Sequence, residues 1–267
     1  AFSWSNISTA QQNSLHDDPT TGGIDNDGKG SARLDYLRGS AANEGTGFNF
    51  RVRSTSKLGD IVNSSPMYIG TSPFGWPDNI EASSYNTFRT STASRKPVLY
   101  VGANDGMLHA FDATVGGANE GKEILAYVPN AVYKNLSKLT NPNYTHQFYV
   151  DGSPNYGDVY FGGSWKTVLV GGLNAGGQAI YALNVTDPSS FSEANAGNIV
   201  MWEYTDADLG FTFSPPVIAR VRAGGSSTAW AAIFGNGYNN STETDGNVST
   251  TGYAYLYVVK IEDGTLI

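Results

Sequence analysis

From residue 59 onward, the chain alternates short apolar runs with turn residues. The runs contain Val, Ile, Tyr, Phe and Trp and are broken by Gly, Asn, Asp or Pro, a pattern typical of β-strands that end at turns. Residues 1–55 are instead rich in Ser, Asn, Gly and Thr and show little apolar periodicity. We therefore predict a loop-rich leading segment over 1–55, with one helix-compatible turn at 34–37, and an all-β domain over 56–267.

Within this domain, three windows share the order strand, Gly/Asn turn, strand. They are residues 98–112, 167–184 and 231–237, the last continued after an insert by 252–261. Each is preceded by another apolar run, at 60–70, 155–162 and 216–221, and the first two are followed by outer runs at 122–128 and 198–204. Strand groups that recur at roughly 60 to 80 residues indicate propeller blades lengthened by inserts. We predict a partial β-propeller with about three blades of a larger propeller, incomplete at the C-terminus.

A β-sandwich is the alternative for any Gly-rich series of strands, because open sheets also alternate apolar and polar residues. The repeated hairpin favours the propeller. Between the first two blades, Val132, Leu136 and Leu139 recur at helical spacing and Pro142 ends the segment. This spacing predicts a short surface helix that joins the blades.

Composition agrees with a folded, non-nucleic-acid-binding protein. A chain of 267 residues with 40% apolar side chains can bury a full core, and its net charge of -8 repels polyphosphate. No stretch approaches the roughly 20 apolar residues of a membrane span. The absence of Cys excludes disulfides and thiolate metal sites but leaves the compartment open. Both ends of the chain look cut from a longer polypeptide.

Few residues suggest catalysis. The three histidines, His16, His109 and His146, have no spacing that suits a metal pair. For His109 we expect a neutral side chain packed between blades and satisfied by one backbone hydrogen bond. The chain also lacks the Gly-x-Ser-x-Gly motif of serine hydrolases. We therefore predict a protein that is not an enzyme.

One acidic loop is a candidate calcium site. Asp25 and Asp27 are two residues apart, as in a calcium-binding loop, but Lys29 occupies the next ligand position and no Glu follows at position twelve. The segment is therefore no EF-hand. A non-standard site of Asp25, Asp27 and Asp35 stays open beside the alternative of a solvated turn.

A long insert, residues 70–95, carries several aromatic side chains in a polar context that does not suit a strand. Phe74, Trp76, Tyr85 and Phe88 are candidate binding residues within it. An insert of this length is either a recognition loop or a lid that covers a blade edge. The sequence leaves both interpretations open.

Six segments also resemble a known family, in the same order along the chain. They are 34–39 (LDYLRG), 58–66 (LGDIVNSSP), 100–112 (YVGANDGMLHAFD), 149–154 (YVDGSP), 165–172 (WKTVLVGG) and 181–188 (YALNVTDP). Together they resemble the C-terminal β-propeller domain of the PilC/PilY family, the large tip-associated proteins of bacterial type IV pili. The resemblance extends from about Leu34 to the C-terminus.

This resemblance implies an exported protein at the type IV pilus tip, the outer membrane or the bacterial cell surface. It implies a role in pilus (fimbrium) biogenesis, contact with minor pilins, and adhesion to a host-cell or abiotic surface. Under this hypothesis the rim loops 70–95, 140–146 and 236–251 would carry recognition, because large loops on a rigid scaffold usually do. The remainder of the same polypeptide, or a second chain, would close the open propeller.

Two departures from the family limit what the resemblance implies. Some members read Arg-Gly-Asp where this chain has Arg38, Gly39 and Ser40, so integrin-type recognition by this tripeptide is not expected. The family's calcium loop has no matching segment before Ile267. We therefore expect no cofactor in this segment and place calcium in the C-terminal part that follows it.

Two other functions share the hairpin pattern. A scaffold propeller of an outer-membrane assembly factor would have the hairpins but lack segments such as 34–39 and 58–66. A quinoprotein dehydrogenase would hold a pyrroloquinoline cofactor with calcium at the propeller axis, often beside a vicinal Cys pair. This chain contains no Cys, which weakens the second alternative.

Overall fold

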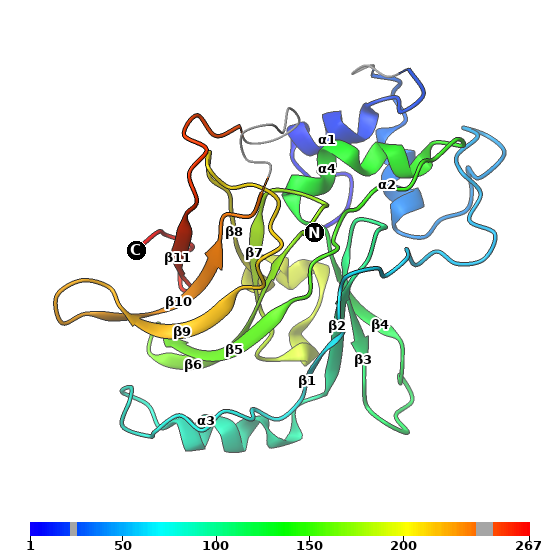
Figure 1. Ribbon diagram of the computed structural model, residues 1–267. Helices are drawn as coiled ribbons and strands as arrows, with labels where there is room; N and C mark the ends of the chain where they lie inside the picture. Colours follow the sequence, from blue (N-terminus) through cyan, green and yellow to red (C-terminus); the bar gives the residue numbers. More distant parts are fainter. Residues whose placement is uncertain (22–25, 239–247) are drawn as a thin grey trace.

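The computed structural model describes residues 1–21, 26–238 and 248–267, and the strands of this part of the chain form three antiparallel sheets (Figure 1). The first sheet, blade 1, contains β1 (Met67–Ile69), β2 (Val98–Gly102), β3 (Leu108–Asp112) and β4 (Glu123–Tyr127). The second sheet, blade 2, contains β5 (Asn155–Phe161), β6 (Ser164–Gly172), β7 (Ile180–Asn184) and β8 (Val200–Tyr204). The third sheet, blade 3, contains β9 (Val217–Arg222), β10 (Thr228–Gly235) and β11 (Leu256–Lys260). In each sheet, strands adjacent in the chain are paired neighbours. These are propeller blades, and the predicted three-blade arrangement with a shorter last blade is confirmed.

The predicted hairpins are antiparallel strand pairs. In blade 1, β2 and β3 pair from Val98 opposite Asp112 to Gly102 opposite Leu108. Gly106 in the connecting turn has a φ of 96°, a conformation that L-residues with a side chain rarely adopt. A Cβ atom there would also lie 2.5 Å from Cδ2 of Leu136. The turn therefore needs glycine for both conformation and space.

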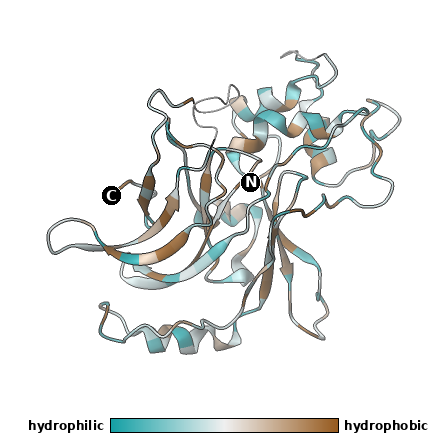
Figure 2. Ribbon diagram, in the orientation of Figure 1, coloured by the Kyte–Doolittle hydropathy of each residue, from teal (hydrophilic) through white to brown (hydrophobic). Residues whose placement is uncertain are grey.

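Blades pack face to face through two clusters of buried side chains. The strand β6 shows how the sequence serves both faces, because successive side chains of a strand point to opposite sides. Leu169 joins the cluster shared with blade 1, whereas Val168 and Val170 join the cluster shared with blade 3. The strands of blade 2 are therefore apolar on both faces. Figure 2 shows many of the most hydrophobic residues on the strands and hydrophilic ones on the helices.

The leading segment is more helical than predicted. It contains α1 (Thr9–His16) and α2 (Gly30–Leu37), and the predicted turn at 34–37 is the end of α2. The side chain of Ser8 caps α1 by accepting a hydrogen bond from the backbone N–H of Gln11, and the side-chain oxygen of Gln11 accepts one from the backbone N–H of Ser8. This capping box was the sequence signal for α1.

The predicted helical segment between the first two blades is confirmed. It consists of a 3-10 turn at Asn130–Val132, α4 (Tyr133–Leu136) and a second 3-10 turn at Ser137–Thr140. The apolar residues that predicted it, Val132, Leu136 and Leu139, are buried. The helix α1 contacts α4 from above in Figure 1. The helical connection 130–140 thus supports the leading segment through its contact with α1.

The insert between β1 and β2 leaves blade 1 and crosses blades 2 and 3 along the lower side of Figure 1. It contains α3 (Tyr85–Ser91) and a 3-10 turn at Thr92–Ser94. The indole N–H of Trp165 in blade 2 donates to the carbonyl of Ser83 at 2.8 Å, and Arg220 in blade 3 pairs with Glu81 at 2.7 Å. The insert therefore binds both following blades.

Blade 3 has one covered and one open face. Phe234, Tyr257 and Val259 are buried against blade 2, so alternate residues of the same strands point to the other side. On that side Leu256 is 72% exposed and Val217 is 56% exposed. The backbone N–H of Ile267 donates to the carbonyl of Val258 at 2.8 Å, and Leu266 forms an isolated bridge with Val259 of β11.

The helical elements in the described part of the chain include a last group between β7 and β8. It comprises 3-10 turns at Pro188–Ser190 and Glu193–Asn195, followed by α5 (Ala196–Ile199). None of the helices in the described residues has the length and apolar character of a membrane span.

Candidate functional site

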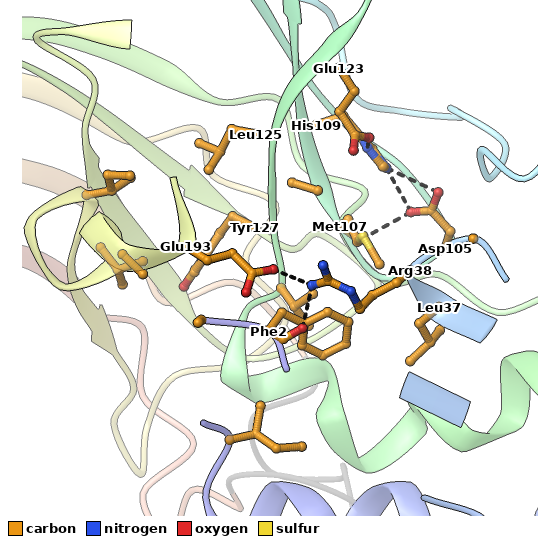
Figure 3. A pocket seen from close by; sticks show the side chains of 18 of the residues that line it. Phe2, Leu37, Arg38, Asp105, Met107, His109, Glu123, Leu125, Tyr127 and Glu193 are labelled. Carbon is orange, nitrogen blue, oxygen red and sulfur yellow. Dashed lines mark hydrogen bonds and ion pairs between the residues drawn. The ribbon is translucent and has the colours of Figure 1, made fainter. Parts of the chain in front are cut away.

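A cavity of about 810 Å³ lies where the leading segment meets the outer edge of blade 1 and the helical connection of blade 2 (Figure 3). Residues 123–128, which span β4, form one wall, and the end of α2 faces them. The basic, acidic and histidine side chains that line it are Arg38, Lys57, Asp105, His109, Glu123, Glu193 and Glu203. This concentration of charge on a mainly apolar wall makes the cavity the candidate site.

His109 lies between two carboxylates at the upper right of Figure 3. Its Nδ1 is 2.7 Å from Glu123 and its Nε2 is 3.1 Å from Asp105. Burial lowers the pKa of His109, but the hydrogen bonds to Asp105 and Glu123 outweigh burial and raise the pKa to about 9. The imidazole is therefore charged at neutral pH. The expectation of a neutral His109 satisfied by a backbone bond is wrong.

The arrangement around His109 does not suit a metal ion. The two carboxylates approach opposite ring nitrogens, so they lie on opposite sides of the imidazole and do not converge with it on one point. In residues 1–21, 26–238 and 248–267, no group of three or more His, Cys, Asp or Glu side chains could hold a metal ion. The three residues form a buried charge network in the wall of the cavity.

An ion pair spans the cavity in Figure 3. The guanidinium of Arg38, at the end of α2, pairs with Glu193 in the β7–β8 connection and also donates to the carbonyl of Phe2 at 2.6 Å. Both charged side chains are close to half exposed, and such pairs contribute only about 0.2–1 kcal/mol. The leading segment and blade 2 are therefore joined here by a weak link.

A second contact in the cavity joins β4 to β8. The hydroxyl of Tyr127 donates to Glu203 at 2.6 Å, and the backbone N–H of Asn130 donates to the same carboxylate at 2.8 Å. Burial, followed by the charge of Glu203, holds the pKa of Tyr127 well above its ordinary value. The phenol therefore stays protonated and fixes β4 to β8.

Of the three aspartates of the predicted calcium site, the structure describes Asp27 and Asp35. Asp27 accepts hydrogen bonds from Nη1 and Nη2 of Arg33 at 2.7 and 2.6 Å. Burial raises the pKa of Asp27, but these bonds and the backbone N–H of Lys29 lower it to about 2. Asp35 lies exposed on α2, and Asp25 lies outside the described residues. A calcium site at Asp25, Asp27 and Asp35 stays a prediction.

The aromatic side chains predicted as binding residues face the core. Tyr85 is buried, and Phe74, Trp76 and Phe88 are partly buried against the cluster shared by blades 2 and 3. The ring centroids of Trp76 and Trp230 are 5.0 Å apart. The insert thus covers these blades, which was one of its two predicted roles, and ligand binding by these residues stays a prediction. Of the rim loop 236–251, only 236–238 and 248–251 are described.

No motif in the sequence joins Arg38, Asp105, Glu123 and Glu193 in one site. Asp105 and His109 are four residues apart across the β2–β3 turn, which is the one local signal of their contact. His109 and Glu123 lie 14 residues apart on adjacent strands, and Arg38 and Glu193 are 155 residues apart. Their meeting depends on how the blades and the leading segment pack.

Comparison with known proteins identifies close relatives of this chain. Residues 58–267 match the family described as the PilY1 beta-propeller domain. The type IV pilus biogenesis factor PilY1 of Pseudomonas aeruginosa (strain PAK) is 40% identical over 274 residues, covering 99% of this chain and 21% of that protein. A PilY1 homolog of Xylella fastidiosa (strain Temecula1) is 42% identical over 250 residues, covering 88% and 15%.

A solved structure is also similar. The crystal structure of the Pseudomonas aeruginosa PilY1 C-terminal domain superposes with a TM-score of 0.56 and 34% sequence identity, covering 74% of this chain and 35% of that chain. This chain therefore spans about a fifth of the PilY1 relative from strain PAK and about a third of the solved domain.

Proposed function

Since the chain belongs to the PilY1 β-propeller family, we propose that it acts in type IV pilus biogenesis as part of the propeller of a longer PilY1-like protein. The observation that carries this function is the 40% identity to a type IV pilus biogenesis factor over 99% of the chain. The three consecutive blades give this relationship its structural basis.

In this proposal the protein is exported and is located at the cell surface and at the tip of the pilus. There it contacts minor pilins and attaches the pilus to host cells or abiotic surfaces as an adhesin. The cavity beside β4 and the rim loops are the surfaces available for such contacts, because they stand on rigid blades. Calcium, where the protein uses it, binds in the part that follows this chain.

The role is binding and not catalysis. Both ring nitrogens of His109, the histidine in the cavity wall, are engaged by carboxylates. Neither nitrogen is free to take a proton from a nucleophile, which a general base must do. The charged groups of the cavity stabilise the fold and shape the surface that a partner meets.

The remainder of the same polypeptide closes the propeller in this proposal. The open side of blade 3 presents Val217 and Leu256, both more than half exposed. Blades in a propeller bury such a face against the next blade. A following blade would cover these residues, next to the bridge that Leu266 forms with Val259 of β11.

The test is a bacterial strain that lacks the gene, complemented with the whole gene or with a version that lacks residues 58–267. We expect the strain without the propeller segment to lose surface pili in electron micrographs and to lose attachment. The whole gene should restore both, and an antibody to the propeller should label the ends of sheared pili. Normal pilus number and attachment without the segment, with no label on pili, would refute the function.

A further inference from the structure

A second cavity, of about 290 Å³, lies between α2, residues 51–60 and the β2–β3 turn. Three basic side chains line it, Arg51, Arg53 and Lys57, although the protein as a whole has a net charge of -8. The hydroxyl-bearing residues Ser54 and Thr55 line it as well. The contacts that each basic side chain makes with the protein decide which positive charges are available to a ligand.

Arg53 is paired with an acid of the protein itself. Its Nε donates to Glu44 at 2.7 Å, its Nη1 to the carbonyl of Tyr36 at 2.8 Å and its Nη2 to the carbonyl of Ser40 at 2.8 Å. The side chains of Arg53 and Glu44 are both buried. Arg53 therefore holds the loop in place, and its charge is matched by Glu44.

Arg51 differs from Arg53 in its partners. Its guanidinium lies over the ring of Tyr144, with Cζ 4.1 Å from the ring centroid, and its Nε is 3.4 Å from the hydroxyl of Tyr36. Within the described part of the chain, Arg51 forms no ion pair, and its Nη1 and Nη2 donate no hydrogen bond to the protein. The side chain is held in position and half-buried, yet its charge is not matched.

The two acids of this cavity already have partners in the protein. Asp60 contacts His146 at 2.8 Å and accepts from the side chain of Asn104 at 3.2 Å. Asp105 contacts His109 and accepts from the backbone N–H of Gly59 at 2.8 Å. Lys57 donates to the carbonyl of Gly39, which is neutral. The cavity thus has an excess of positive charge, centred on Arg51 and Lys57.

Keeping a half-buried guanidinium without a counter-charge costs free energy. A bound anion would remove this cost. The two Nη atoms of arginine form a planar fork that matches the two oxygens of a carboxylate. The volume of about 290 Å³ far exceeds the roughly 30 Å³ of a water molecule, so the cavity has room for more than a bare ion.

We propose that this cavity binds an acidic sugar of monosaccharide size, a hexuronate, whose carboxylate accepts hydrogen bonds from Nη1 and Nη2 of Arg51. Lys57 adds positive charge at the rim, and the hydroxyl groups of Ser54, Thr55 and Ser56 suit the hydroxyl groups of a sugar. The binding rests on the geometry of the cavity and does not depend on the role in pilus biogenesis.

The test is isothermal titration calorimetry of the full chain with glucuronate, with glucose as its neutral counterpart and inorganic sulfate as a bare anion. We expect glucuronate to bind, glucose to bind at least tenfold more weakly, and sulfate more weakly than glucuronate. Arg51→Gln should weaken glucuronate binding at least tenfold. Arg222→Gln removes the same charge from an exposed position on β9 and should leave binding unchanged.

Arg51→Lys keeps the charge but not the planar fork, so it should bind glucuronate with an affinity between the wild-type and Arg51→Gln values. A thermal unfolding midpoint that matches the wild type shows that each variant is folded. Absence of glucuronate binding to the wild type, equal binding of glucose and glucuronate, or unchanged binding by folded Arg51→Gln would each overturn the proposal. Sulfate binding as tight as glucuronate would overturn the assignment to a sugar.

Discussion

The hydroxyl of Tyr85 provides a sharp test of how the insert is held. Tyr85 comes from α3 and donates to the carboxylate of Asp158 on β5 at 2.7 Å. The other oxygen of this carboxylate accepts from Oγ1 of Thr167 on β6, also at 2.7 Å. Asp158 is fully buried, so no water replaces a donor that is lost. Burial, followed by Asp158, raises the pKa of Tyr85 far above its ordinary value, so the phenol stays protonated.

The substitution Tyr85→Phe removes this hydrogen bond and little else. The ring remains and keeps its contact with Trp165, whose centroid is 4.8 Å away. A hydrogen bond to a charged group contributes about 1.5–3 kcal/mol. We therefore expect the free energy of unfolding to fall by roughly 2 kcal/mol.

Tyr160→Phe is the matched control. Tyr160 also packs against Trp165, with centroids 5.5 Å apart, but its hydroxyl makes only a 3.4 Å contact with Ser83. We expect this change to cost less than about 0.5 kcal/mol.

Both variants are measured by urea unfolding followed by circular dichroism, with midpoint and slope fitted separately. An unchanged slope means that the insert is still docked in the folded state. Equal losses for Tyr85→Phe and Tyr160→Phe, within about 0.5 kcal/mol, would refute the reasoning that the buried carboxylate depends on Tyr85.

Three further predictions address the cavity and the hairpin. Folding raises the pKa of His109 from 6.5 to about 9. Protonated His109 therefore stabilises the folded state fully below pH 6.5, and this stabilisation is lost as the pH rises through about 9. The unfolding free energy should fall over this pH range, and His109→Gln should abolish that fall. Removing Arg38 or Glu193 by substitution with Gln should show a coupling energy of at most about 1 kcal/mol in a double-mutant cycle of urea unfolding, and a larger value would contradict the weak link. Gly106→Ala should destabilise by more than about 1 kcal/mol, beyond Gly116→Ala, which has a similar positive φ but no neighbouring atom within 4 Å; equal thermal midpoints would contradict this difference.

The blades could be predicted because their signal is local. The window 98–112 contains two strands and a glycine turn within fifteen residues, and the same order recurs twice more. The helix α1 was missed because its apolar pattern is weak: Leu15 is its one buried residue. The capping box of Ser8 and Gln11 nonetheless marks the start of α1 in the sequence.

The candidate site could not be predicted, because its pairs depend on tertiary packing. Arg38 and Glu193 are 155 residues apart in the chain, and no spacing rule joins them. His109 meets Glu123 only because β3 and β4 pair with Phe111 opposite Glu123. The role of the aromatic residues in the insert could not be predicted either, because a lid and a recognition loop have the same composition.

The insert also determines how the blades respond to mechanical load. In a repeat architecture each unit contacts only its neighbours, so units can detach one at a time. Here a segment that starts in blade 1 reaches blade 3, where Glu81 pairs with Arg220 at 2.7 Å and Trp76 contacts Trp230. Peeling blade 3 away therefore also breaks contacts with a segment anchored in blade 1. Under tension, the three blades should yield in one event and not in succession.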